Sequence, residues 1–223
     1  MQNKKSLAKL SAARIVASLF GVLAGLGGMT HGVGEVLQGN VAPEGIAINS
    51  WTQGPIATNM GGEPGITLVP NLLLTGLLTL LVSLSILLWA TRYVHRKNGG
   101  RILILLSIVM LLVGGGIGPP LIGILAGVAR TAIGAPLSGW RSRLPLGAQH
   151  FLAALWPWLF AVAAISGFFL VVGSLILVYF FGLNDADLFL NTFYFTVLSL
   201  LLTVLLAPLF DNRQRERGAA ILN

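Results

Sequence analysis

The side chains best suited to acid–base or metal chemistry lie in and just before the longest polar segment of the sequence, residues 32–65. His31 and Glu35 are four residues apart, so a helix that continued through them would carry both on one face. Together with Glu44 or Glu63 they could bind a metal ion or form an acid/base pair. Because no recognised metal spacing such as HExxH is present, we predict a polar cluster of His31, Glu35 and Glu63 at the outer mouth of the molecule, within a solvated cap. We predict neither a metal site nor a catalytic residue.

A second unusual feature is a run of glycines and prolines inside an apolar stretch, at Gly114, Gly115, Gly116, Pro119 and Pro120. Glycine supplies the backbone freedom that a turn requires, and proline lacks the amide donor that a turn would leave unpaired. We therefore expect the chain to reverse here, with a positive φ angle at one or more of the glycines. Because non-helical backbone inside a bilayer needs protein or water around it, the turn should be buried among helices. The alternative is one full-length helix kinked at Pro119.

Hydroxyl-bearing side chains form two stripes at helical spacing. The first stripe comprises Thr67, Asn71, Thr75, Thr79 and Ser83, and the second comprises Thr192, Thr196, Ser199 and Thr203. The members that we expect to line a polar cavity with the Gly/Pro turn are Asn71, Thr75, Thr79, Thr196 and Ser199. Alternatively, the hydroxyls bond carbonyls of their own helix or join helices, and Asn71 only satisfies a turn near the surface. No ionisable residue lies centrally in an apolar run, which argues against an ion-coupled pump.

The segment from 130 to 150 combines basic and aromatic side chains and contains no acid. The residues concerned are Arg130, Trp140, Arg141 and Arg143. A basic side chain near an anionic membrane surface contributes about 1 kcal/mol of attraction. We therefore expect this set to contact anionic lipid head groups on the cytoplasmic side. An enzyme that binds lipid phosphate would use the same set, together with His95 or His150.

The elements that must position these residues are membrane helices. The chain is 55% hydrophobic and 9% charged, with a mean hydropathy of +0.85, far from the usage of soluble proteins. A span needs about 20 apolar residues, and five runs qualify: 12–31, 66–90, 102–129, 151–181 and 188–210. The third contains the Gly/Pro segment, and each of its arms is too short to cross a bilayer. The chain has no cysteine, which excludes disulfides and thiolate chemistry.

The distribution of charge predicts the topology, since cytoplasmic loops collect Lys and Arg. If all five runs crossed, six of the fourteen basic residues would lie outside, namely Arg130, Arg141, Arg143, Arg213, Arg215 and Arg217. If the third run enters and leaves on the cytoplasmic side, all fourteen are cytoplasmic, and five acids lie outside: Glu35, Glu44, Glu63, Asp185 and Asp187. We therefore expect both termini in the cytoplasm. The basic clusters are short, so the net charge of +7 indicates membrane orientation and no nucleic-acid binding.

The expected fold class is an all-α integral membrane protein, a compact bundle of four transmembrane helices plus a re-entrant Gly/Pro hairpin. The alternative is five transmembrane helices with the third kinked. One membrane domain covers 1–223, with an outer loop at 32–65, cytoplasmic loops at 91–101 and 130–150, and a cytoplasmic tail at 211–223. The patterns "GVLAG" and "GILAG" are expected contact faces, within the chain, in a homo-oligomer or with a membrane partner. A bacterial or archaeal cell membrane is the expected location.

Three functions are compatible with this architecture. The favoured one is a passage or binding cavity for a small solute, with the hairpin at its constriction. The alternatives are an enzyme of the membrane face that acts on lipid head groups, and a non-catalytic membrane partner or assembly protein. No P-loop lysine follows the glycine run and no GxSxG nucleophile motif occurs. An enzyme is therefore the less favoured reading, and no cofactor is expected.

Overall fold

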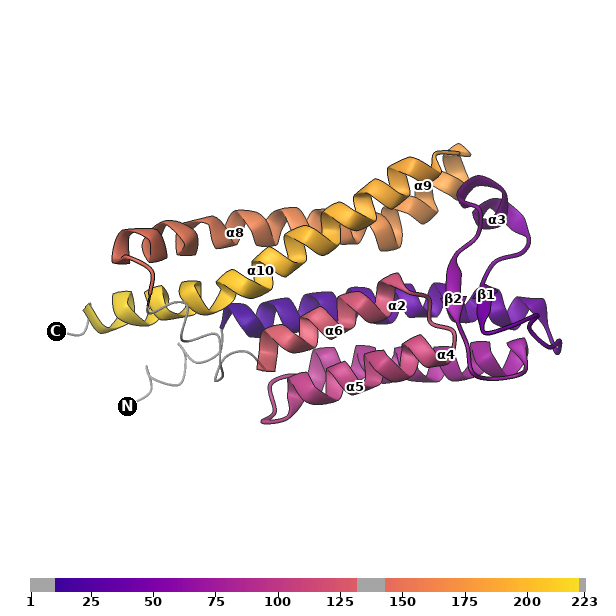
Figure 1. Ribbon diagram of the computed structural model, residues 1–223, viewed down its shortest axis with the longest axis horizontal. Coiled ribbons are helices and arrows are strands. Elements are labelled where there is room, and N and C mark those ends of the chain that lie inside the picture. The colour runs from indigo at the N-terminus through magenta and orange to yellow at the C-terminus, as the bar shows by residue number, and fades with distance from the viewer. Residues whose placement is uncertain (1–10, 132–142, 221–223) are drawn as a thin grey trace.

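The structure, a computed structural model, describes residues 11–131 and 143–220 of the chain. Its long helices run roughly along one axis, and a small cap of two short strands and a short helix covers one end (Figure 1). The elements in chain order are α2 (Ala12–Gln38), β1 (Ala47–Asn49), α3 (Gly54–Met60), β2 (Pro64–Ile66), α4 (Leu72–Leu88), η1 (Trp89–Tyr93), α5 (Gly99–Leu112), α6 (Gly118–Thr131), α8 (Leu146–Phe168), η3 (Phe169–Gly173), α9 (Ser174–Phe181) and α10 (Ala186–Ala220). The elements η1 and η3 are π-helical turns that continue the α-helices before them.

Four helical segments of the described chain are long and apolar enough to cross a membrane. They are Ala12–Gln38, Leu72–Tyr93, Leu146–Phe181 and Ala186–Ala219, the third being α8, η3 and α9 in one continuous helix. With 27 residues, α2 is about 40 Å long, more than the roughly 30 Å of a hydrocarbon core. The protein is therefore an all-α, multi-pass integral membrane protein.

A helical hairpin lies between the second and third of these segments. Its arms, α5 and α6, have 14 residues each and run antiparallel, with their connecting turn next to β1 and β2 (Figure 1). Each arm is about 21 Å long, shorter than the bilayer core. The expected reversal at the Gly/Pro segment is confirmed, and two separate helices stand in place of one helix kinked at Pro119.

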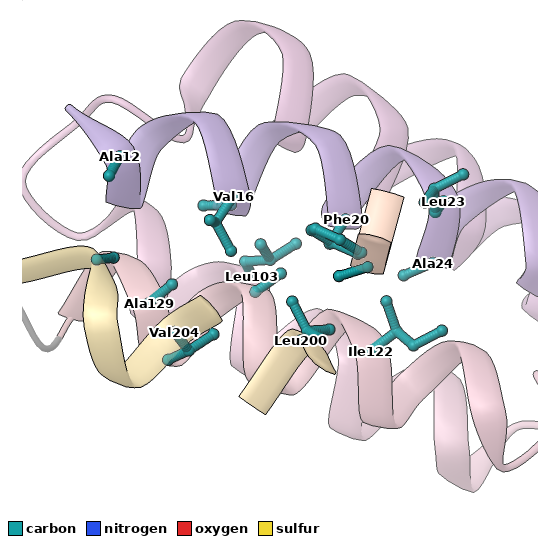
Figure 2. Packing of buried hydrophobic residues seen from close by; sticks show 14 of the residues in the cluster. Ala12, Val16, Phe20, Leu23, Ala24, Leu103, Ile122, Ala129, Leu200 and Val204 are labelled. Atoms are coloured by element: carbon teal, nitrogen blue, oxygen red, sulfur yellow. The ribbon is translucent and has the colours of Figure 1, made fainter. Parts of the chain in front are cut away.

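The hairpin packs against α2 and α10 in the main hydrophobic core. Figure 2 shows Val16 and Phe20 of α2 close to Leu103 of α5 and Leu200 of α10, and all four side chains are fully buried. The most apolar stretch of α2 is 61% buried inside the molecule, whereas the most apolar stretch of the Leu146–Phe181 helix is 22% buried. Accordingly, α2 is the central helix of the bundle and α8–α9 is peripheral.

The glycine faces predicted from the sequence are used inside the chain. A Cβ atom on Gly25 would lie 2.7 Å from Leu87 Cγ, and one on Gly127 would lie 2.7 Å from the carbonyl oxygen of Gly100. Such contacts are too close for any side chain, so glycine allows α2 to approach α4 and α6 to approach α5. The "GVLAG" and "GILAG" patterns therefore serve packing between helices of one chain.

Two boundaries differ from the sequence prediction. The first helix continues seven residues past His31 to Gln38, so the outer loop begins at residue 39. Gly32 and Gly34 suggested a loop, but both lie in the helix and allow close packing, Gly32 against Gly76 of α4 and Gly34 against the carbonyl of Ser50. The last helix likewise continues through most of the expected tail, to Ala220.

Charge separates the two ends of the bundle. Among the described residues, the basic side chains lie where α2 begins, where α4 meets α5, where α6 ends, and at the start of α8 and the end of α10. The opposite, capped end contains five acids, Glu35, Glu44, Glu63, Asp185 and Asp187. Asp185 caps α10, since its side chain accepts a hydrogen bond from the Leu188 amide at 2.9 Å. We call these the basic end and the acidic end.

Candidate functional site

The Gly/Pro turn has the positive φ angles that its sequence predicts. The φ angles of Gly114 and Gly116 are +109° and +76°, which confirms the expectation of positive values. Each glycine also lies against a polar side chain, because a Cβ on Gly114 would be 2.6 Å from Glu35 Oε1, and one on Gly116 would overlap the His31 ring. Glycine is therefore required twice here, for backbone conformation and for the close approach of two ionisable side chains.

The backbone of this turn finds partners in the protein, as burial in a bilayer demands. The amide of Leu68 donates to the carbonyl of Leu112 at 2.9 Å, and Thr67 and Val113 pair as an isolated β-bridge. From α4, the hydroxyl of Thr79 donates to the carbonyl of Val113 at 2.6 Å. The hairpin tip is consequently fixed between α4 and the chain that leads into it.

A buried chain of polar side chains crosses the region between this turn and the cap. His31 Nδ1 is 2.9 Å from Ser50 Oγ, and Ser50 donates to Glu35 Oε1 at 2.9 Å. The exposed fractions of His31, Ser50 and Glu35 are 5%, 0% and 0%. The three form one hydrogen-bonded unit inside the molecule, so His31 and Glu35 are buried and do not lie in a solvated cap.

The far side of the imidazole ring faces a second carboxyl group. His31 Nε2 lies 3.5 Å from Glu63 Oε2, too far for a good hydrogen bond, and Glu63 Oε2 has no hydrogen-bond partner among the described residues. If Ser50 donates to Glu35, His31 Nδ1 must carry a hydrogen, and Nε2 of a neutral ring presents a lone pair to Glu63. Such a pair repels unless a proton lies between the two atoms.

This contact borders a cavity of about 450 Å³, within the roughly 300–1,000 Å³ typical of small-molecule sites. The cavity lies between α2, the residues that follow the Gly/Pro turn, η3 and α10. Most of its wall is apolar, including Pro119, Ile122, Val171, Leu175, Phe189 and Phe193. His31, Glu63 and Thr30 are polar residues at its inner side. A π-helical turn such as η3 is a frequent feature of functional sites.

The rim of the cavity consists of side chains on the outer surface of the helices. Ile117, Leu190 and Tyr194 line it, with 45%, 49% and 61% of their surface exposed. On a membrane helix an exposed apolar side chain faces lipid. The cavity thus reaches from the apolar surface of the bundle to the buried His31–Glu63 contact.

The hydroxyl stripe of α4 meets the hairpin turn, and that of α10 does not. Thr75 is fully buried, bonds Thr67 at 3.0 Å and lies against Gly114, while Thr79 holds Val113. Asn71 has the capping role that we considered as the alternative, because its side chain accepts from the Leu74 amide at 3.0 Å at the start of α4.

On α10 the hydroxyls bond carbonyls of their own helix. Thr196 donates to Thr192 at 2.8 Å and Ser199 donates to Phe195 at 2.8 Å. Both are buried, Thr196 against Gly167 of α8. Neither Thr75 nor Thr196 is among the residues that line the cavity beside the hairpin turn. The hydrogen bonds within α10 support the packing alternative for this helix.

The residues expected at lipid head groups are only partly described. Arg130 ends α6, and its guanidinium donates to the carbonyls of Val94 and His95, each at 3.3 Å. Arg143 precedes α8 at the same basic end. Trp140 and Arg141 lie outside the described residues.

The structure brings His31, Glu35 and Glu63, which the sequence singled out, into one neighbourhood and adds Ser50 and this cavity, which the sequence did not indicate. Ser50 is one of many serines, and only the pairing of β1 with β2 brings it between His31 and Glu35. No group of three His, Cys, Asp or Glu suited to a metal ion occurs in the part of the chain that the structure describes. Comparison with known proteins gives no match: no family model fits the chain, and no curated protein or solved structure is similar to it.

Proposed function

We propose that this membrane protein binds a small, mostly apolar molecule with one polar group in the cavity beside its hairpin turn. The observation that carries the proposal is the position of His31 and Glu63, two hydrogen-bonding groups at the inner side of an otherwise apolar cavity. Ligand sites are mostly apolar with a few convergent polar groups that fix orientation. This is the binding-cavity form of the function favoured from the sequence.

The position of the rim supports entry from the bilayer. Leu190 and Tyr194 of α10 and Ile117 of the hairpin are exposed on the flank of the bundle, where lipid chains would contact them. An amphiphile dissolved in the membrane would reach the cavity sideways, with its apolar body between α10 and α6 and its polar group at His31. The hydroxyls of Thr196 and Thr203 donate to carbonyls of their own helix, α10. This argues against a water-filled passage for a polar solute.

The proposal includes a topology. Short cytoplasmic loops are rich in Lys and Arg, so the basic end would lie in the cytoplasm, with both termini, and the acidic end outside. In that arrangement α5 and α6 form a re-entrant hairpin, and the cavity lies in the outer half of the bilayer. The basic end, with Arg130 and Arg143, would contact anionic head groups of the inner leaflet.

Binding of triphenylphosphine oxide tests the proposal. This neutral probe has an apolar body and one strong hydrogen-bond acceptor. Equilibrium dialysis against the protein in lipid nanodiscs, with empty nanodiscs as reference, should show saturable binding with a stoichiometry of about one per chain.

A matched pair of variants locates the site. Leu190→Trp places a large ring at the rim and should weaken binding at least about tenfold, because the ring occupies the entrance. Leu198→Trp is the control, since Leu198 is equally exposed on α10 at 57% and lies outside the cavity. Absence of saturable binding, or equal loss in both variants, would refute a ligand site in this cavity.

A further inference from the structure

We infer that the ligand of this cavity is a lipophilic cation, and that protons compete with it at the contact between His31 and Glu63. The inference rests on the proposed function and adds the chemical class of the ligand and its regulation by pH. It follows from the charge around the cavity, from the side chains of its walls and from the hydrogen-bonded unit behind it.

The cavity lies in a part of the molecule that has acids and no Lys or Arg. The sequence contains no basic residue other than histidine in segments 15–91, 102–129 and 144–212, which supply every element that lines the cavity. Glu63 is at the inner side, and Asp185 and Asp187 flank Ala186, which also lines it. A cavity lined by one sign of charge between low-dielectric walls attracts ions of the opposite sign. An anionic head group would find no positive partner here, whereas a cation would find Glu63.

The walls suit a cation with an apolar body. Phe189, Phe193 and Tyr194 come from α10, and the rings of Phe193 and Tyr194 lie 5.8 Å apart. Aromatic faces attract cations, more strongly where water is excluded. A lipophilic cation could therefore place its charge near Glu63 and its hydrocarbon surface against the α10 rings and Pro119.

His31 gives the site a second feature that points to a ligand. Its side chain is 7% exposed and lines the cavity, yet its Nε2 forms no hydrogen bond within the described residues and faces only Glu63 at 3.5 Å. The other ring nitrogen is held by Ser50, which in turn is held by Glu35. The contact of Nδ1 with Ser50 thus fixes the ring. Nε2 is directed at the Glu63 carboxyl group, with which a cation would pair.

Protons and the cation compete for the same carboxyl group. His31 and Glu63 face each other, and Glu35 is linked to His31 through Ser50. From α10, the titratable group that lines the cavity is Tyr194, while Asp185 and Asp187 lie exposed on either side of the lining residue Ala186. The hairpin, η3 and β2 add none. A proton at the His31–Glu63 contact removes the negative charge that would pair with the cation. The affinity for a cation should therefore fall as the pH falls, and cation binding should release protons to water wherever the contact is partly protonated.

Two probes of nearly the same shape test this inference in nanodiscs. Methyltriphenylphosphonium carries a permanent positive charge and no titratable proton, and triphenylphosphine oxide is its neutral counterpart. The phosphonium should bind more tightly at the alkaline end of the range, with an affinity that rises by up to about tenfold per pH unit through the titration of the contact. The affinity of the oxide should not rise with pH, because its oxygen only accepts hydrogen bonds and the contact has a hydrogen to donate only when it is protonated. Two further outcomes are decisive: equal, pH-independent binding of both probes overturns the inference and leaves the proposed function intact, whereas binding of neither probe refutes the proposed function itself.

Glu63→Gln and Glu44→Gln form a matched pair of variants. Glu63→Gln should weaken phosphonium binding at least about tenfold and flatten its pH profile, without weakening oxide binding, because the amide keeps the shape, loses the charge and can donate a hydrogen bond to the oxide. Glu44 is an exposed acid of the same cap outside the cavity, so Glu44→Gln should leave both probes unaffected. Unchanged phosphonium binding in Glu63→Gln contradicts the inference. If that variant also loses oxide binding, its cavity is altered, and the pH profile of the unmodified protein decides.

Discussion

Each end of the bundle contains a buried carboxyl group, and the two are used differently. At the basic end, Asp211 of α10 is 8% exposed, and its Oδ1 accepts a hydrogen bond from the Ala12 amide at 2.7 Å, at the first turn of α2. Helix starts present unpaired amides and a partial positive charge, both of which a carboxylate satisfies. At the acidic end, Glu35 lies in the last turn of α2, where the amides are bonded within the helix and the partial charge is negative.

Glu35 Oε1 accepts a hydrogen bond from Ser50, and the same hydroxyl is 2.9 Å from Nδ1 of His31, which lines the cavity. Local structure therefore explains the buried acid at the basic end, which joins two helices. It does not explain the one at the acidic end. A fold that needed only stability would place an apolar residue at position 35, because burying a charged group is costly. Asp211 therefore has an architectural role, and the burial of Glu35 fits the ligand site that we propose at the acidic end.

The largest expected effect concerns the sidedness of the two ends. Cysteines introduced singly into this cysteine-free chain at Ala186 and Ala219, both exposed in the structure, should differ completely in labelling by an impermeant thiol reagent in intact cells. Ala186 belongs to the acidic end and should react, while Ala219 belongs to the basic end and should react only after permeabilisation. The reverse pattern would refute the topology, as would labelling of both positions from outside.

The second largest effect is expected at the hairpin turn. Gly116→Ala forces a side chain into a φ of +76° and against the His31 ring, so it should cost about 3 kcal/mol or more of stability. Gly147→Ala is the matched control at the basic end, because nothing lies within 4 Å of a Cβ there. In the first turn of α8 that change should be neutral or slightly stabilising. Thermal unfolding in detergent measures both, and equal effects would contradict a turn that depends on glycine.

A smaller loss is expected from the hydroxyl between the two ionisable groups. Ser50→Ala leaves Glu35 Oε1 and His31 Nδ1 without their partner in a site with 0% exposure. An unpaired buried polar group costs about 1–3 kcal/mol. The variant should also reduce the pH dependence of phosphonium binding, because the His31 ring loses its contact with the Ser50 hydroxyl. Unchanged stability together with an unchanged pH profile would show that the unit has no role.

The smallest effect is expected at the basic end. Asp211→Ala removes a side-chain cap from α2 and should cost about 0.5–2 kcal/mol, measured in the same thermal assay. Binding of both probes should stay unchanged, since Asp211 is at the opposite end from the cavity. A loss of probe binding in Asp211→Ala would contradict a purely architectural role for the basic end.

Much of the fold could be predicted from the sequence, because it follows from periodicity and special residues. Four long apolar helices, the reversal at the Gly/Pro segment, the short strand near residue 47 and the Asp185 cap all have local causes. Placing His31 and Glu35 on one helical face also succeeded, because their spacing alone determines it.

The remainder of the site depends on contacts between distant segments. Burial of Glu35 requires Gly114, 79 positions later, and its partner Ser50 comes from a loop with no distinctive pattern. Gly34 in α2 was read as part of a loop, although it is a contact surface for Ser50 and Trp51. The hydroxyl stripes of α4 and α10 look alike in sequence, and only the neighbouring helices decide that one meets the hairpin and the other bonds its own backbone.

Photo-crosslinking tests the central claim most directly, that a lipophilic cation occupies the cavity at the acidic end. An aryl azide derivative of methyltriphenylphosphonium, activated in nanodiscs and mapped by mass spectrometry, should label the cavity walls, at residues 186–194 of α10 and 117–122 after the hairpin turn. Excess unlabelled phosphonium should prevent this labelling, and lowering the pH should reduce it. Labelling confined to the lipid-facing side of α4 or to the basic end, or labelling that unlabelled probe does not displace, would contradict the account.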